Sequence, residues 1–240
     1  MGSALALLLG VFKLGKAGGT LFTMLISLAV YAGMFGWRYA AGFIGLLMIH
    51  EMGHFVAARQ RGLAVGTPTF IPFVGAWIQL KDQPMDVETE AYVAAAGPFC
   101  GTIGATLIYF WGRDAESGLL LAIAYSGFFL NLFNLIPLSP LDGGRMTSIL
   151  SPRIWFLGAP LMLAMMAYRP SPLLVMILVL SVPSLITAWK FDPHAEENRL
   201  YYAASSSLKL EYGALYLGLA AYLAVMTDAT HKIVQSGTGG

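Results

Sequence analysis

Four long stretches of this chain contain no charged residue, and they constrain its fold more than any other feature of the sequence. They are Thr20–Trp37, Ala91–Gly112, Ser117–Leu141 and Pro170–Trp189. A helix of about 20 apolar residues crosses the roughly 30 Å of hydrocarbon in a bilayer. The composition agrees, because 57% of the residues are hydrophobic and 11% are charged, against about 25% charged residues in soluble domains. The sequence therefore predicts an integral membrane protein.

Three further segments are candidates for crossing the membrane. Tyr39–Ala58 is apolar apart from a short polar motif at its end, and Ile154–Tyr168 is short but flanked by arginines. Tyr212–Thr227 is shorter than a comfortable span, so it either crosses or lies in the interface. The predicted fold is an all-α polytopic membrane protein with about six transmembrane helices, five to seven in all. The apolar run Ser3–Phe12 is too short to span and is expected to be an interfacial helix.

Charge and cysteine content exclude other classes of protein. The net charge is +1 and no basic stripe is present, so no nucleic-acid partner is expected. The single cysteine, Cys100, excludes an internal disulfide bond. If each span crosses in turn, most lysines and arginines fall on the side reached by the C-terminal end of Tyr39–Ala58. The positive-inside rule makes that side cytosolic.

The polar motif is His50-Glu51-Met52-Gly53-His54, an H-E-x-x-H pattern at the end of an apolar helix. Histidines four residues apart lie on one face of a helix, so both imidazoles can reach one zinc ion. In this pattern the glutamate serves as the general base of a metallopeptidase. The sequence therefore predicts zinc chemistry inside a bilayer.

Catalytic zinc usually has three protein ligands and one open position. The third ligand of soluble families is absent, because Ala57 and Gln60 occupy the positions of the glycine and histidine in the longer zinc motif. Asp142 is the candidate instead. It follows the apolar run that contains Asn134, and an aspartate at membrane depth is normally paired or bound to metal.

The H-E-x-x-H of one membrane helix, followed by Asn134-Leu-Ile-Pro-Leu-Ser-Pro-Leu-Asp142-Gly143 at the end of a later one, resembles the site-2 protease family of intramembrane zinc metalloproteases. This resemblance implies one Zn²⁺ per chain, held by His50, His54 and Asp142, with Glu51 as general base. It also implies a catalytic role for Asn134 near the scissile bond, for which Asn131 is an alternative. About thirty residues separate Arg61 from Ala91, too few for the PDZ domain of larger members, and the C-terminal tail has no room for a CBS pair.

A substrate peptide bond must be extended before it can be attacked. The segment Thr69–Leu80 combines β-favouring residues with Pro72 and Gly75, which predicts a small membrane-associated β-hairpin after the H-E-x-x-H helix. We expect its edge to bind the substrate as an added strand. The predicted substrate-binding residues are Val74, Gly75, Ala76, Trp77, Ile78 and Gln79.

The predicted protein is a single integral-membrane metalloprotease domain over residues 1–240. It comprises an interfacial segment at 1–19, a catalytic transmembrane core at 20–189, and a cytosolic loop with a C-terminal helix at 190–240. The predicted function is cleavage of a transmembrane segment of another protein near the cytosolic face. Regulation is expected from another membrane protein, from homo-oligomer formation or from the bilayer itself. The alternatives are a membrane zinc peptidase acting on soluble or lipidated peptides, and a transporter or scaffold without proteolytic activity.

Overall fold

Seven long helices make up most of the chain in the computed structural model, which describes residues 15–66, 69–72, 75–77 and 86–237. These helices are α2 (Gly15–Phe35), α3 (Trp37–Gln60), α4 (Val87–Asp114), α5 (Gly118–Asn134), α7 (Trp155–Tyr168), α8 (Pro172–Trp189) and α10 (Ser206–Gly237). Between them lie the short helices α6 (Asp142–Thr147) and α9 (Glu196–Tyr201) and the 3₁₀ turn η1 (Pro152–Ile154). The two strands, β1 (Thr69–Ile71) and β2 (Gly75–Trp77), form an antiparallel pair. The predicted helical architecture is confirmed.

Five helices of the described chain are long and apolar enough to cross a membrane, namely α2, α3, α4, α8 and α10. The run predicted to be short, Tyr212–Thr227, lies within the 32-residue helix α10, so the apolar stretch underestimates the length of the helix. Conversely, Ser117–Leu141 is not one helix, because α5 ends at Asn134 and is followed by a turn. The number of membrane crossings stays a prediction, as does the interfacial helix at Ser3–Phe12, which lies outside the described residues.

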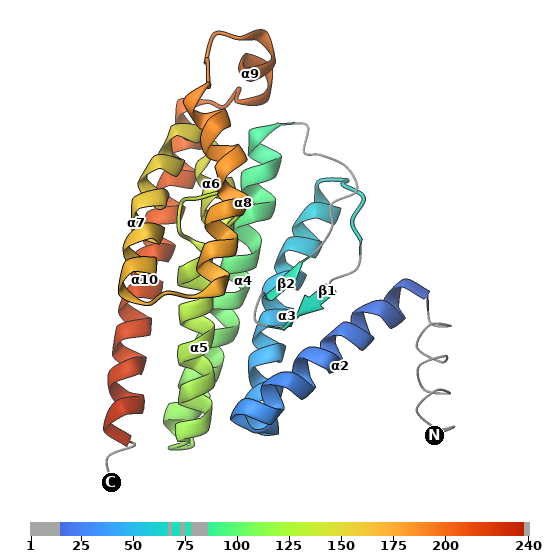
Figure 1. Ribbon diagram of the computed structural model, residues 1–240, viewed down its shortest axis with the longest axis vertical. Helices are drawn as coiled ribbons and strands as arrows, with labels where there is room; N and C mark the ends of the chain where they lie inside the picture. The colour runs from blue at the N-terminus through green and yellow to red at the C-terminus, as the bar shows by residue number, and fades with distance from the viewer. Residues whose placement is uncertain (1–14, 67–68, 73–74, 78–85, 238–240) are drawn as a thin grey trace.

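The helices stand roughly side by side, with α4 between α3 and α5 (Figure 1). α10 runs along α5, while α2 packs against one end of α3 and tilts away from it toward the other. α7 and α8 form a pair whose connection lies partway along the bundle, rather than at the end where α4 joins α5 (Figure 1). This pair therefore extends along only one half of the molecule, the half that includes α6 and α9.

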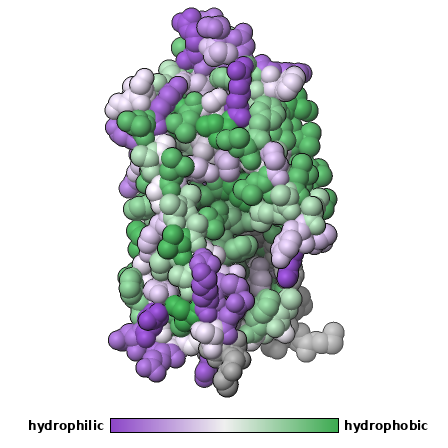
Figure 2. Space-filling view, turned by 90° about the vertical axis from the view of Figure 1, so that its left-hand side faces the viewer, coloured by the Kyte–Doolittle hydropathy of each residue, from purple (hydrophilic) through white to green (hydrophobic). Residues whose placement is uncertain are grey.

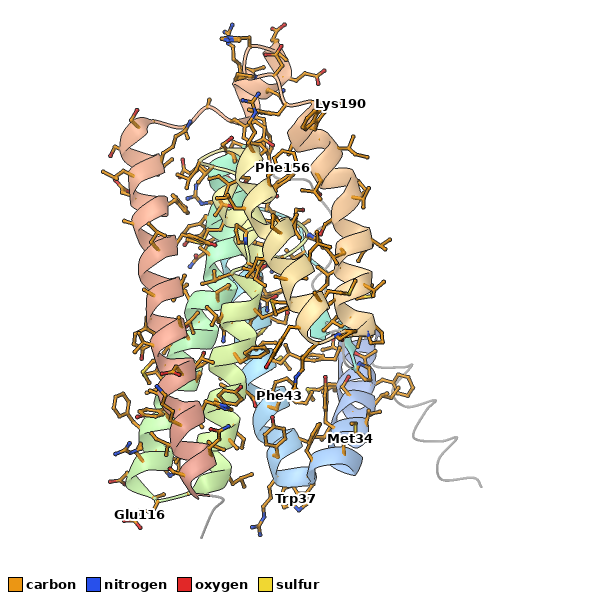
Figure 3. The ribbon with its side chains drawn as sticks, turned by 60° about the vertical axis from the view of Figure 1, so that its left-hand side comes forward. Met34, Trp37, Phe43, Glu116, Phe156 and Lys190 are labelled. Atoms are coloured by element: carbon orange, nitrogen blue, oxygen red, sulfur yellow. The ribbon has the colours of Figure 1, made fainter. Side chains whose placement is uncertain are left out.

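Polar residues concentrate at the two ends of the bundle, with apolar residues over most of the surface between them (Figure 2). Trp37 and Glu116 mark one end, and Lys190 lies near the other, beside α9 (Figure 3). We call the latter the α9 end. Large apolar side chains between the ends are exposed, including Leu107, Leu157 and Val179 at 64–70%. An exposed apolar belt of this kind suits contact with lipid.

Close packing around α4 determines where the polar groups of α3 lie. Glycines permit this packing: a side chain at Gly53 of α3 would strike the backbone of Ala96, and one at Gly127 of α5 would strike Leu46. The residues between α3, α4 and α5 are buried, with Leu46 and Phe128 at 1% and 0% exposed. The three helix backbones therefore approach closely around the H-E-x-x-H turn.

Candidate active site

Two helix segments far apart in the sequence bring three candidate ligands together. His50 and His54 lie one turn apart on α3, and Asp142 is the first residue of α6. The His50 and His54 Nε2 atoms are 3.1 Å apart, and Asp142 Oδ2 lies 3.1 Å from the first and 3.2 Å from the second. All three residues are at most 9% exposed. The structure thus assembles the ligand set predicted from the sequence.

The hydrogen bonds behind the two imidazoles decide which ring nitrogen is free. His54 Nδ1 donates to the Val93 carbonyl oxygen (2.7 Å), which can only accept. His50 Nδ1 lies 2.8 Å from Asn131 Oδ1. The Asn131 amide is oriented by its nitrogen, which donates to the Gly127 carbonyl oxygen (2.7 Å). Both histidines therefore carry their hydrogen on Nδ1 and present the lone pair of Nε2 to the centre of the site.

Two imidazole lone pairs and a carboxylate oxygen repel one another unless a proton or a metal cation lies between them. Ligand atoms of a tetrahedral zinc ion, with bonds of about 2.0–2.2 Å, lie about 3.3 Å apart. The three separations of 3.1–3.2 Å fit that geometry closely. Oxygens behind each imidazole are also the usual outer partners of metal-bound histidines. The donor set therefore suits a tetrahedral metal ion with one open position.

Two glycines of α4 shape the floor of the site. A side chain at Gly97 would collide with the His54 ring, and one at Gly101 would collide with the Asn131 amide. The two glycines are one helical turn apart, and each lies against a group that fixes the ligand set. The structure identifies close approach of His54 as the reason for glycine at position 97.

Asp142 is positioned by the backbone of the turn that follows α5. Gly143 and Gly144 lie so close to the backbone of Leu135 and Ser139 that a side chain at either glycine would collide with it. Trp155 Nε1 donates to the Gly144 carbonyl oxygen (2.8 Å), and the Tyr216 hydroxyl donates to that of Leu135 (2.7 Å). α7 and α10 thus each hold this turn by one hydrogen bond, which fixes the depth of Asp142.

Glu51 lies next to the ligand set and is 5% exposed. Its carboxylate is within electrostatic range of His50, His54 and Asp142. Among the residues that the structure describes, none donates a hydrogen bond or forms an ion pair with it. A buried carboxylate without a fixed partner is available to exchange a proton with a reactant.

Asn131 and Asn134 occupy different positions. Asn131 is 1% exposed and bonds to His50, whereas Asn134, the last residue of α5, is half-buried. Within the described chain, the Asn134 side chain makes no hydrogen bond. The sequence analysis does not predict the contact between Asn131 and His50. Its one signal in the sequence is that Asn131 lies three residues before Asn134, about one helical turn away.

The predicted substrate-binding segment is described in part. Gly75, Ala76 and Trp77 form β2, which pairs with β1 in the register Phe70↔Ala76. Val74, Ile78 and Gln79 lie outside the described residues. Phe70 is 2% exposed among residues of α2 and α3, and its backbone N–H donates to Thr23 Oγ1 of α2 (3.1 Å). The strand pair is therefore anchored between α2 and α3, and β2 packs against the helix that carries the histidines.

An apolar helical bundle that encloses two histidines, an aspartate and an unpaired glutamate has the features of a membrane metallopeptidase. Residues 38–116 match the model of Peptidase family M50. The chain is 39% identical over 67 residues to the probable chloroplastic zinc metalloprotease EGY1 of Arabidopsis thaliana. It is 30% identical over 129 residues to the putative zinc metalloprotease Rip3 of Mycobacterium tuberculosis. The resemblance to zinc metalloproteases of the site-2 type is confirmed.

These matches are partial in length. They cover 26% and 48% of this chain, and 12% and 32% of the two relatives, so the chain spans a third or less of the length of these two proteins. Among solved structures, the site-2 protease from Methanocaldococcus jannaschii aligns with 71% of this chain and 87% of its own, with a TM-score of 0.46 and 21% identity.

Proposed function

We propose that this protein is a zinc-dependent endopeptidase that cleaves a transmembrane segment of a membrane-protein substrate. One observation supports this most directly: three ligand atoms within 3.2 Å of one another and the unpaired Glu51 carboxylate are buried in a bundle whose outer surface is apolar. A site enclosed in this way meets substrates that lie in the bilayer. The proposed zinc ligands are His50, His54 and Asp142, with one ion per chain.

Bound at these three residues, zinc supplies a Lewis acid that polarises a carbonyl group and lowers the pKa of water toward about 7. Glu51 takes the proton of the attacking water and returns it to the leaving amine. The Nδ1–H bonds of the two histidines, to Asn131 and Val93, hold both rings in the orientation that leaves Nε2 free. Asn131 acts through His50 and is a positioning residue.

Asn134 is the proposed donor to the developing oxyanion. Its side chain lies at the end of α5, eight residues before Asp142, with its amide hydrogens unengaged within the described chain. A donor that is not committed to the protein can form its hydrogen bond as negative charge develops in the transition state. The Asn131 amide is instead oriented toward His50, because its oxygen accepts from the imidazole and one of its N–H groups donates to Gly127.

Substrate binding is assigned to the β-hairpin. β2 lies beside α3, and we propose that Val74, Gly75, Ala76, Trp77, Ile78 and Gln79 pair with an unwound substrate segment as an added strand. The added pairing would hold the scissile bond extended, which removes the helical hydrogen bonds that shield it.

The active site is proposed to open toward the cytosol, because basic residues gather at the α9 end. Its partners would be the lipid bilayer and the transmembrane substrate. A regulatory membrane protein or a second copy of the chain would control access.

Two substitutions test the proposed function. Glu51→Gln keeps every ligand, so we expect normal zinc content with no cleavage of a membrane-protein substrate. His54→Ala removes a ligand, and we expect loss of both zinc and cleavage. Zinc content is measured by atomic emission on purified protein, and substrates are found by comparing membrane proteins of cells with wild type and with Glu51→Gln. Protein without zinc, or undiminished cleavage by Glu51→Gln, would refute the proposal.

A further inference from the structure

A cavity with both apolar and polar walls lies at the α9 end, lined by none of the proposed metal ligands. Its volume is about 380 Å³. Its walls come from the segment that follows α6, from η1, from the loop after α8, from α9 and the residue after it, and from the start of α10. Sites for small molecules have volumes of about 300–1,000 Å³. The cavity is therefore large enough for a small polar ligand or a lipid headgroup.

Three basic side chains line this cavity, from three different elements. Arg153 belongs to η1, Arg199 to α9 and Lys209 to α10, and no acidic residue is in the lining. Arg153 Nη2 donates to the Phe191 carbonyl oxygen (3.1 Å). Within the described chain, the charged groups of Arg199 and Lys209 make no hydrogen bond or ion pair, although Lys209 is half-buried.

Three other cations of the described chain form ion pairs, whereas none of the three that line the cavity does; Arg38, Arg113 and Arg169 are likewise without an ion pair. Arg61 pairs with Glu88, Arg145 with Glu90 and Lys232 with Asp228. Acidic residues also lie near the cavity in sequence, but they do not line it. The Asp192 carboxylate, for example, accepts the backbone N–H of His194 (2.9 Å). Three like charges around one space repel one another unless an anion occupies it.

Neutral donors complete the lining. One N–H of Asn198 Nδ2 donates to the Asp192 carbonyl oxygen (2.8 Å), which leaves the second N–H of Asn198 available. Burial, and to a smaller extent the nearby Glu90 carboxylate, raises the pKa of Tyr202 to about 12, so the Tyr202 hydroxyl keeps its hydrogen. Arginine, lysine and neutral N–H and O–H donors together are the groups that bind phosphate oxygens.

The cavity lies beside a boundary between apolar and polar surface. Trp189 is the last residue of α8, is 80% exposed and packs edge-on against Phe156, with ring centroids 6.3 Å apart. Lys190 follows it at the α9 end (Figure 3). Exposed tryptophan beside lysine is typical of the level of lipid headgroups.

We propose that this cavity binds a phosphate-bearing anion, either the headgroup of an anionic phospholipid or a soluble phosphate ester. Two cations alone would match a carboxylate. Three cations on separate walls, with neutral donors between them, match the several oxygens of a phosphate better. Such an anion would join η1, α9 and α10, which meet at this cavity.

The test compares two triple variants of the full chain with equal change in charge. One is Arg153→Gln with Arg199→Gln and Lys209→Gln. The control is Arg38→Gln with Arg113→Gln and Arg169→Gln, none of which lines the cavity. Native mass spectrometry of purified protein mixed with equal amounts of phosphatidylglycerol and phosphatidylcholine measures lipid preference. Thermal unfolding in detergent with glycerol phosphate or inorganic phosphate measures binding of soluble anions.

We expect wild type and the control to prefer phosphatidylglycerol by a factor on the order of ten, and the cavity variant to lose this preference. Stabilisation by glycerol phosphate that is lost in the same variant would identify a soluble ligand as an alternative source of the phosphate. Lys209→Gln alone, checked for folding by gel filtration, should lose part of the effect. An equal loss in the control and cavity variants, or no loss in either, would overturn the proposal.

Discussion

Each histidine of the ligand pair is fixed by an oxygen behind its ring, and the oxygen that serves His50 belongs to a side chain that can be replaced. Asn131→Leu removes this acceptor while preserving size. We expect a fall of about 10–100-fold in zinc affinity, as is usual when an outer partner of a metal ligand is lost. Competition with a zinc-binding dye measures it.

Asn134→Leu is the matched comparison, because it changes the same residue type one turn away. If Asn134 donates to the oxyanion, zinc affinity stays normal and the turnover number falls by about 10²–10³. Equal effects of the two substitutions on zinc affinity would contradict the separate roles given to the two asparagines.

Gly97 offers a second test at the residue scale. Gly97→Ala places a methyl group where the His54 ring lies, and the ring must move out of the ligand set. We expect loss of zinc binding and of activity, with the helices intact by circular dichroism.

The control for Gly97→Ala is Gly45→Ala in α3, where an added methyl group meets no atom within 4 Å. Alanine is favoured over glycine in a helix by about 0.5–1 kcal/mol, so this variant should unfold at the same or a higher temperature and keep its zinc. Normal zinc content in Gly97→Ala would show that the site tolerates displacement of His54.

The grouping of the three proposed ligands could be predicted from the sequence, because H-E-x-x-H has a fixed spacing and an aspartate at membrane depth is unusual. The groups behind them could not. The Val93 carbonyl oxygen is a backbone atom and leaves no trace in residue type. The functions of Gly97 and Gly101 depend on which side chains α3 and α5 place against α4, and only the packed bundle determines this.

At the scale of elements, the backbone of the hairpin gives a specific test of strand addition. The Phe70 N–H points to α2, where it donates to Thr23. Opposed residues in an antiparallel pair either exchange both backbone bonds or neither. Ala76, opposite Phe70, therefore also turns its N–H away from β1, toward the side where a substrate strand would pair.

Ala76→Pro removes that N–H without removing a bond between β1 and β2. Cleavage should fall by about two- to tenfold, as one hydrogen bond contributes about 0.5–1.5 kcal/mol, and zinc content should not change. Ala76→Val keeps the N–H and serves as the control. A turnover assay on a transmembrane substrate in detergent gives both values, and equal activity of the two variants would exclude this edge as the substrate site.

Element boundaries were predicted less well than element types. The apolar run Tyr212–Thr227 suggested a short segment, yet α10 extends over 32 residues. Its polar ends, including Lys209 and Lys232, continue the helix beyond the apolar stretch. In the opposite sense, Pro137 and Pro140 follow the end of α5 and separate Asp142 from it, although the apolar run continues to Leu141. Hydrophobicity reports the environment of a segment, whereas helix ends depend on backbone hydrogen bonds and on proline.

For the whole molecule, the distribution of cations between the two ends predicts its orientation. Arg59, Arg61, Arg145, Arg153, Lys190, Arg199 and Lys209 belong to elements that meet near the α9 end. Arg38, Arg113 and Lys232 belong to the opposite end, where α3 begins and where α4 and α10 stop, and Arg169 lies in the connection between α7 and α8. An excess of lysine and arginine marks the cytosolic side, so α9 is expected in the cytosol.

Single cysteines on a Cys100→Ser background test this orientation. Ala115→Cys lies where α4 meets α5, and Glu197→Cys lies on α9; both positions are exposed. Between them lie α5 and the pair α7 and α8. α7 and α8 either both cross the membrane or both turn back, so together they leave the chain on the side where α5 ends. If α5 crosses the membrane, the two cysteines therefore lie on opposite sides. A membrane-impermeant maleimide should label Ala115→Cys in intact cells and Glu197→Cys only after the membrane is opened. The reverse labelling pattern would show that the protein has the opposite orientation in the membrane. Labelling of both cysteines from one side would show that α5, at 17 residues, does not span the membrane.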